Sequence, residues 1–260
     1  MQDIVREAGA MLKSAHLSTS EIHEKEGPAN FCTDYDLRIQ RFIMGRLAEV
    51  APGCSSFGEE DTEGNHGSAT SPYTFYIDPI DGTTNFVFDY HHSCVSVGVA
   101  YAGQLVAGYV YNPYVDELYH AVRGEGAWLS DRMLVMQDKS IREGIVAFGC
   151  ARYNDGDTNL LFDVTRQMFL GSLSIRNGGS AALDLCRIAS GSNVAYYELK
   201  LQPYDYAAAS VIIEEAGGRI SRVDGSGITL DRPCSIVGGT ETAWREVRAM
   251  IAGAGFVEQA

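Results

Sequence analysis

Two carboxylates and a hydroxyl group lie within six residues of one another at Asp78, Asp81 and Thr83. Residues 73–77 before them are aromatic and β-branched, which favours a buried strand. The proline after Asp78 has no backbone N–H and disfavours a helical conformation before it, so we expect both carboxylates to project from a bend where the strand ends. Gly82 and Thr83 then open a helical turn whose free amides can face an anion. This arrangement predicts a hard cation held against a phosphate, and an Asp-rich turn formed only for its geometry is the alternative.

Three further acids could complete a metal site. Glu59 lies in a Gly-Glu-Glu-Asp run, for which a solvated acidic loop is the alternative. Asp36 lies in Thr33-x-x-Asp36, a pattern that the residues alone assign to capping a helix. Asp205 precedes a strongly apolar helix, expected over 206–216, and is interpreted as its N-cap. Spacing alone does not place these acids beside Asp78 and Asp81.

Magnesium accepts about six oxygen ligands, usually a few carboxylates together with water and substrate phosphate. The ligands that the sequence could offer to two such ions are Glu59, Asp78, Asp81 and Asp205, with the backbone carbonyl of Ile80. Two ions about 3.5–4 Å apart can clamp the attacking and leaving oxygens of a phosphoryl transfer, so no protein nucleophile is needed. Glu59 or the Thr83 hydroxyl would orient or deprotonate the attacking water, and the Gly82 and Thr83 amides would hold the phosphate.

Composition and charge bound the function. The chain has 260 residues, of which 45% are hydrophobic, enough for one large α/β domain or two small ones. Its formal net charge of −14 disfavours nucleic acid and anionic membranes as partners, although metal ions could reverse the sign locally for a phosphate ester. Six singly spaced cysteines indicate reduced thiols and a cytoplasmic location. Charges at Asp3, Arg6 and Glu7 argue against a signal peptide, and the stretch 94–111 alternates in polarity like a hairpin rather than a membrane span.

The elements that must position these residues alternate between helices and short strands. Helical spacing predicts helices over 1–16 and 33–50, with a loop over 21–30 between them. Hairpin strands over 93–101 and 105–111 and a third strand over 117–122 predict a largely antiparallel meander. The second half is expected to contain strands at 145–148, 174–176, 194–197, 219–223 and 235–237, and helices over 158–169, 180–191, 206–216 and 242–252. We therefore predict one α/β domain over residues 1–260, made of layered sheets and helices, which could divide into two lobes near residue 150.

Four segments of the chain resemble the inositol monophosphatase family. Residues 75–86, Phe-Tyr-Ile-Asp-Pro-Ile-Asp-Gly-Thr-Thr-Asn-Phe, closely resemble the first signature of that family. Gly58-Glu59-Glu60 is similar to its Gly-Glu-Glu element, and Thr33-x-x-Asp36 to its Thr-x-x-Asp. Its second signature is similar to Tyr204-Asp205, followed by Ala207-Ala208 and closed by Glu215-Ala216-Gly217-Gly218. Order and separations agree from about Lys25 to Gly218, which is most of the chain.

The resemblance implies a layered α-β-α-β-α fold similar to the sugar phosphatases, with largely antiparallel or mixed sheets. It implies a Mg²⁺-dependent, lithium-sensitive homodimer that hydrolyses inositol monophosphate or similar small polyol phosphates with two or three Mg²⁺ ions per site. The implied metal ligands are Glu59, Asp78, Ile80 through its carbonyl, Asp81 and Asp205.

The same resemblance assigns the other roles. Thr83 would activate the water, Asp36 would polarise that threonine, and Glu59 is counted with them as catalytic. Lys25 with Pro28 would lie on a mobile loop over the site. The implied substrate contacts are Asp81, Gly82, Thr83, Gly179, Ser180, Ala181, Glu198 and Asp205.

Departures from the family pattern concern the substrate. Tyr204 replaces a usual tryptophan, His91 a usual proline, and Asn30 a frequent aspartate. Hydrolysis of histidinol phosphate or fructose 1,6-bisphosphate on the same metal core is therefore the alternative, and a non-catalytic regulatory protein that retains the fold is a second. A zinc pair at His91-His92 is disfavoured because adjacent strand residues face opposite sides. The sequence contains neither the Gly-x-x-x-x-Gly-Lys-Ser/Thr of nucleotide kinases nor the Gly-x-Gly-x-x-Gly of nicotinamide enzymes.

Overall fold

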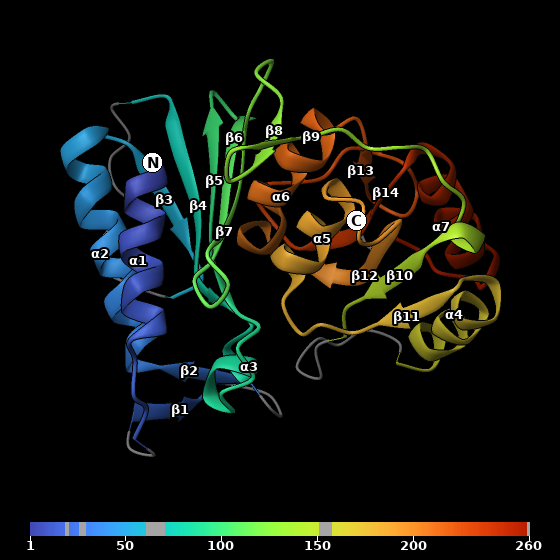
Figure 1. Ribbon diagram of the computed structural model, residues 1–260, viewed down its shortest axis with the longest axis horizontal. Coiled ribbons are helices and arrows are strands. Elements are labelled where there is room, and N and C mark those ends of the chain that lie inside the picture. Colours follow the sequence, from blue (N-terminus) through green and yellow to red (C-terminus); the bar gives the residue numbers. More distant parts are fainter. Residues whose placement is uncertain (19–20, 26–29, 61–70, 151–157, 259–260) are drawn as a thin grey trace.

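The larger of two main sheets occupies the first half of the chain in the computed structural model, which describes residues 1–18, 21–25, 30–60, 71–150 and 158–258. Its strand order is β3-β4-β5-β6-β7-β8-β9 (Figure 1). Only β3 and β4 pair in parallel, which confirms the predicted meander. The three-residue strands β8 and β9 were not predicted, because so few residues show little alternation. The bounds are β3 (Ser55–Gly58), β4 (Tyr73–Asp81), β5 (Cys94–Tyr101), β6 (Gln104–Asn112), β7 (Glu117–Val122), β8 (Ala127–Leu129) and β9 (Arg132–Leu134).

The second half of the chain forms a mixed sheet in the order β11-β10-β12-β14-β13. β10 pairs in parallel with β11 and β12, whereas β14 is antiparallel to β12 and β13. All five strands lie where periodicity predicted strands. Their bounds are β10 (Ile145–Phe148), β11 (Ser174–Arg176), β12 (Ala195–Leu201), β13 (Arg219–Ser221) and β14 (Cys234–Gly239).

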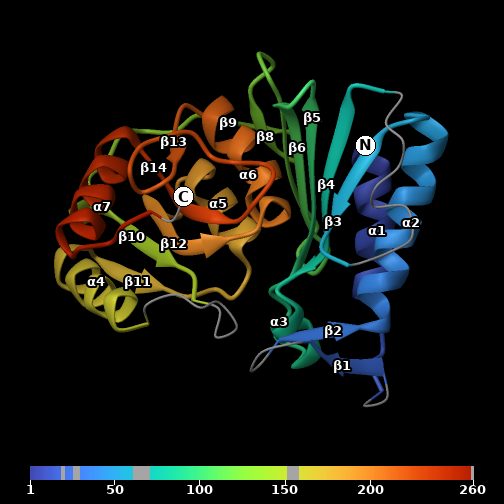
Figure 2. The same cartoon turned by 180° about the vertical axis from the view of Figure 1, so that it is seen from behind.

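Helices cover both outer faces of these sheets and fill the space between them (Figure 1, Figure 2). α1 and α2 pack on the outer face of the larger sheet, α5 and α6 lie between the two sheets, and α4 and α7 cover the outer face of the smaller sheet. The predicted α-β-α-β-α layering is therefore confirmed. The bounds are α1 (Gln2–Lys13), α2 (Asp34–Val50), α4 (Thr158–Gly171), α5 (Ala181–Ala189), α6 (Pro203–Glu215) and α7 (Glu241–Gly253), with short helices α3 (Thr83–Val87) and η2 (Ile141–Glu143).

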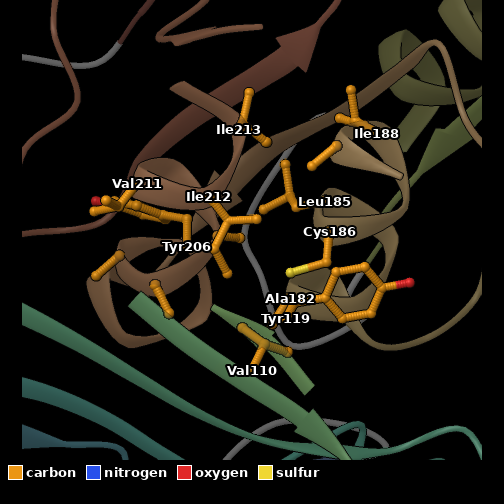
Figure 3. Close-up of a cluster of buried hydrophobic side chains, with 14 of the residues drawn as sticks. Val110, Tyr119, Ala182, Leu185, Cys186, Ile188, Tyr206, Val211, Ile212 and Ile213 are labelled. Atoms are coloured by element: carbon orange, nitrogen blue, oxygen red, sulfur yellow. The ribbon is translucent and has the colours of Figure 1, made fainter. Parts of the chain in front are cut away.

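The middle layer packs unusually close to the larger sheet. Figure 3 shows Leu185 of α5 and Ile212 of α6 meeting beside Val110 of the sheet, all within one buried cluster. Gly98 and Gly108, paired across β5 and β6, have no side chain where α6 crosses them. A Cβ at Gly108 would lie 2.1 Å from the Ala208 carbonyl oxygen, so only glycine permits this approach. The approach brings the first turn of α6 to the end of β4.

Two predicted boundaries at the site were wrong. β4 continues to Asp81 instead of ending at Ile77, with an irregular register between Asp78 and Asp81, because the sheet tolerates the proline at such a bulge. α6 begins at Pro203 with Gln202 as its N-cap, so Asp205 is its third residue rather than its cap. Proline favours the first helical position, and this preference moves the start of the helix upstream.

Residues 22–24 of the predicted loop over 21–30 form a short strand instead. β1 (Ile22–Glu24) pairs antiparallel with β2 (Phe31–Thr33). The proposed mobile segment at Pro28 and the polar run after Asp61 lie outside the described residues. Among the helices of the described residues, none is long and apolar enough to cross a membrane.

Candidate active site

Six carboxylates and two lysines line one cavity of about 700 Å³ between the two main sheets. The acids come from β4, β12, α5, α6 and the segment after β3, so the fold gathers residues that are far apart in sequence. The carboxylates are Glu59, Asp78, Asp81, Asp184, Glu198 and Asp205, and the lysines are Lys25 and Lys200. Negative charge therefore exceeds positive charge among the described residues of the lining.

The end of β4 presents Asp78 and Asp81 to this cavity, both buried. The Ile80 N–H donates to Asp78 Oδ1 at 3.0 Å, which fixes the bulge. Asp81 faces the N-terminus of α5 and accepts hydrogen bonds from the Ser180 hydroxyl at 2.5 Å and the Ala182 amide at 2.7 Å through Oδ2. Its Oδ1 accepts from the Ala181 amide at 3.2 Å. Both oxygens of Asp81 are thus used to start α5.

Burial and mutual repulsion raise the pKa values of these acids. Burial raises the pKa of Asp78 well above its ordinary value, with Glu59 and Asp81 adding to the effect. Burial raises the pKa of Asp205 in the same way, with Asp81 and Glu59 contributing. For Asp81 burial raises the pKa, while the hydrogen bonds from Ser180 and α5 oppose the shift. The site is therefore poorly neutralised, a condition that a bound cation would relieve.

A second acidic group lies next to Asp78. One oxygen from each of Asp36, Glu59 and Glu60 falls within 4.8 Å of the others. The Lys25 ammonium bridges Glu59 at 3.1 Å and Glu60 at 2.6 Å. Burial lowers the pKa of Lys25, but the two glutamates outweigh this effect and raise it. Lys25 is thus a resident countercharge at this end of the cavity.

Gln40, which no sequence pattern indicated, anchors this acidic segment. Its side-chain amide donates to the Glu60 carbonyl at 2.7 Å and accepts from the Glu60 N–H at 3.0 Å. Gly58 leaves the space that the amide occupies. A buried glutamine on α2 therefore fixes the backbone beside Glu59.

Asp36 lies behind the cavity wall rather than in it. Its Oδ2 accepts from the Thr33 N–H at 2.7 Å and the Thr33 hydroxyl at 2.6 Å, so the predicted capping box is confirmed. Its Oδ1 lies 3.5 Å from the Thr83 hydroxyl, whose one proton can be donated either to this oxygen or to the Ile80 carbonyl, 3.1 Å away. Burial raises the pKa of Asp36 to about 7, with Glu59 adding to the shift. A carboxyl group with this pKa can take up or release a proton near neutral pH.

Two glycines shape the wall next to Thr83. Gly82 has φ of +92°, and a Cβ there would lie 3.0 Å from the carbonyl oxygens of both Gly179 and His92. Gly179 has φ of +74° and faces the Asn85 amide. Both backbones adopt conformations that side chains disfavour, so the close approach of these two segments requires glycine.

Glu198 also lines the cavity. The Tyr196 hydroxyl donates to Glu198 Oε2 at 2.5 Å, and Gly149 lies so close that a Cβ there would collide with that oxygen. Burial raises the pKa of Glu198 to about 8, while the bond from Tyr196 opposes the shift. Lys200, two residues along β12, also lines the cavity and was not selected from the sequence.

All the predicted site residues except Asp36 line this single cavity. The donor set consists of carboxylates and the Ile80 carbonyl, the oxygen ligands that hard divalent cations take, and its unneutralised charge fits such ions. Sequence reasoning missed Gln40, Asn85, Asp184 and Lys200. Asp184 alone carried a signal, because it is an acid inside the apolar helix run 181–189.

Known proteins share both the sequence and the fold. A model of the inositol monophosphatase family matches residues 1–254. The inositol-1-monophosphatase of Bacillus subtilis (strain 168) is 30% identical over 247 residues, covering 94% of this chain and 91% of that protein. The crystal structure of the extragenic suppressor protein suhB from Bartonella henselae has a TM-score of 0.88 at 28% identity, covering 96% of each chain. The staphylococcal SaIMPase-II, solved with bound inositol monophosphate, has a TM-score of 0.79 at 29% identity, covering 95% of this chain and 90% of that one. The chain belongs to the inositol monophosphatase family.

Proposed function

We propose that this protein is a Mg²⁺-dependent phosphatase that hydrolyses inositol monophosphate or a similar small polyol phosphate. The observation that carries the proposal is the convergence of Glu59, Asp78, Asp81 and Asp205 on one cavity beside Thr83. The family of the chain is one of phosphatases, and a relative of the same fold has been solved with inositol monophosphate bound.

Glu59, Asp78, Asp81, Asp205 and the Ile80 carbonyl would hold two or three Mg²⁺ ions. When bound, such ions lower the pKa of a coordinated water and neutralise charge on the phosphate and the leaving oxygen. We further propose lithium inhibition, because a site with so many unneutralised acids can admit a competing small cation. All six cysteines are free thiols, which supports a cytoplasmic location.

The residues of the chain itself orient the reactants and move the proton. The Gly82 and Thr83 amides, at the start of α3, would hold the phosphate. The Thr83 oxygen would accept a proton from the attacking water while its own proton moves toward Asp36 Oδ1, 3.5 Å away. The water oxygen bonds to phosphorus and the ester P–O bond breaks. The leaving alkoxide takes a proton from solvent, and Asp36 returns its proton to solvent.

Replacing Thr83 with valine should lower kcat by about 10²–10³-fold and change KM little, because general-base orientation of the water is lost. Thr83→Ser keeps the hydroxyl and should retain activity within about tenfold. The measurement is release of inorganic phosphate from inositol 1-phosphate, with thermal unfolding as the check on folding. Equal activity of the valine and serine variants would remove Thr83 from the mechanism.

Glu198 would select the leaving group. Its side chain lines the same cavity as Thr83, where it would contact a hydroxyl of a polyol ring. Tyr196 holds that carboxylate in place. When bound cations favour its ionised form, a hydrogen bond from a ring hydroxyl to Glu198 contributes about 1.5–3 kcal/mol, so Glu198 could decide between polyol phosphates and other monoesters.

We expect Glu198→Gln to reduce kcat/KM for inositol 1-phosphate by about 10–100-fold, the equivalent of that hydrogen bond. Hydrolysis of p-nitrophenyl phosphate, which has no ring hydroxyl, should change by less than about threefold. The same panel includes histidinol phosphate and fructose 1,6-bisphosphate. Negligible turnover of inositol 1-phosphate by the unaltered protein would favour one of those substrates, and no turnover of any would favour a regulatory protein.

A homodimer is proposed from an apolar face on α4. Phe162, Phe169 and Leu170 recur at helical spacing on α4, and Leu173 follows the end of the helix; the four side chains are 54%, 59%, 72% and 71% exposed. A second copy of this chain would cover the face. Leu170→Glu should therefore shift the protein from dimer to monomer in light scattering coupled to size-exclusion chromatography. The control Val135→Glu changes an isolated exposed residue and should leave the mass unaltered; a monomeric unaltered protein would contradict the proposal.

A further inference from the structure

Two buried polar atoms have no hydrogen-bond partner within the described residues and face each other: His92 Nε2 and Asp184 Oδ1. They lie 3.9 Å apart, and the two side chains are 12% and 2% exposed. A buried polar atom without a partner costs about 1–3 kcal/mol. An imidazole N–H and a carboxylate oxygen are complementary, and a small rotation of the ring would bring them within hydrogen-bond distance.

These atoms belong to a network that ties three segments together. Asp184 Oδ2 accepts from the Gly178 N–H at 2.9 Å. The Asn85 amide donates to the His92 carbonyl at 2.8 Å and to the Gly178 carbonyl at 2.9 Å. A Cβ at Gly178 would lie 2.5 Å from the Asp184 oxygens, so the segment lies directly against this carboxylate. Segment 178–181 is therefore held through both the N–H and the carbonyl of Gly178.

Segment 178–181 in turn determines the geometry of the cavity wall. Its Ser180 hydroxyl and Ala181 amide are donors to Asp81. The Gly179 and His92 carbonyls enclose Gly82 on two sides. A displacement of this segment would therefore move both Asp81 and the backbone proposed to hold phosphate.

We propose that His92 and Asp184 form a buried hydrogen-bonded pair that positions segment 178–181 against Gly82 and Asp81, and so sets affinity for the phosphorylated substrate. Neither side chain is a catalytic residue; both are positioning residues that act through the segment. The inference rests on the proposed phosphatase function for its kinetic readout. His91, the adjacent residue, has an exposed side chain stacked on Tyr114 and lies outside the network.

The kinetic test compares His92→Phe, His92→Gln and Asp184→Ala with the matched control His91→Phe. We expect His92→Phe to raise KM for inositol 1-phosphate about tenfold and to change kcat by less than about threefold. The wall that binds the substrate is positioned less well, whereas the residues that carry out the chemical step are unchanged. His92→Gln, which keeps a donor, should recover most of the affinity. The double variant His92→Phe/Asp184→Ala should bind no worse than Asp184→Ala alone, since the pair is already broken there. His91→Phe should leave KM and kcat unchanged.

A readout independent of activity separates this inference from the proposed function. In ¹⁵N-labelled protein, the His92 ring N–H should give a slowly exchanging, downfield proton resonance that is lost in Asp184→Ala and kept in His91→Phe. A protein that shows this resonance but has no phosphatase activity would contradict the proposed function and still support the His92–Asp184 pair. Absence of the resonance, additive effects of the two substitutions on KM, or a His92→Phe variant that loses thermal stability without any change in KM would overturn the pair.

Discussion

Asparagine in place of Asp78 is expected to lower phosphatase activity by about 10³-fold or more while the protein stays folded. Asp78 is the acid most surrounded by other acids, since Glu59, Asp81, Asp205 and Asp36 all raise its pKa beyond the effect of burial. Such a group is the natural centre of a cation site, and loss of one charged ligand forfeits several kcal/mol of transition-state stabilisation.

The substitution should disturb the local backbone little, because asparagine keeps a side-chain oxygen that can accept a hydrogen bond. The Ile80 N–H can still donate to the amide oxygen at position 78. Asp81 is a poorer choice, because both its oxygens accept from Ser180 and α5, and an amide NH₂ would oppose one of those donors. Asp78→Asn also removes a repelled charge, so the metal-free variant should unfold at a higher temperature than the unaltered protein.

Phosphate release and thermal unfolding in EDTA measure the two effects. Asp163→Asn, which changes an exposed carboxylate on α4, is the matched control and should leave both measurements unaltered. Activity of Asp78→Asn within about tenfold of the unaltered protein would exclude Asp78 from a metal site. A lower unfolding temperature would show that its charge is compensated by groups other than a cation.

Site residues that are far apart in the sequence could be predicted to lie together only from the resemblance to a known family. Periodicity located the meander and the helices of the second half, because those elements are long enough to alternate or repeat. It could not place Asp205 and Asp78 in one cavity, since their proximity depends on α6 crossing β5 and β6 at Gly98 and Gly108. The sequence around these glycines contains no pattern that indicates which helix packs against them.

Of the roles predicted for residues near the site, some were correct and some were wrong, and each outcome has a physical reason. Thr33 and Asp36 form the expected capping box because both partners lie within one turn. Asp205 was misassigned as a cap because the proline before it, not the acid, determines where α6 begins. Gln40 gained its role from tertiary contacts with Glu60, and Lys25 from contacts with Glu59 and Glu60. No spacing rule encodes such contacts.

The strongest pH dependence is expected from the metal-free protein, which should lose stability as the pH rises from about 5 to 8. Burial raises the pKa of Asp36 to about 7 and that of Glu198 to about 8, above the ordinary values of 3.8 and 4.5. Between those limits the folded state holds more protons than the unfolded chain, so the free energy of unfolding falls as protons are lost. One pKa unit corresponds to about 1.4 kcal/mol. The total should be on the order of a few kcal/mol, or a fall in Tm of roughly 5–10 °C, because neutralising one acid relieves its neighbours.

Magnesium should reverse this trend, since it binds the ionised carboxylates that destabilise the empty site. The difference in Tm between protein in MgCl₂ and protein in EDTA should therefore be larger at pH 8 than at pH 5.5, and it should shrink in Asp78→Asn at both. Glu198→Gln removes one titrating group away from the proposed ligands and should flatten only the EDTA profile. A Tm in EDTA that rises between pH 5.5 and 8 would mean that the buried acids are already paired, and the case for divalent cations at this cavity would lose its electrostatic basis.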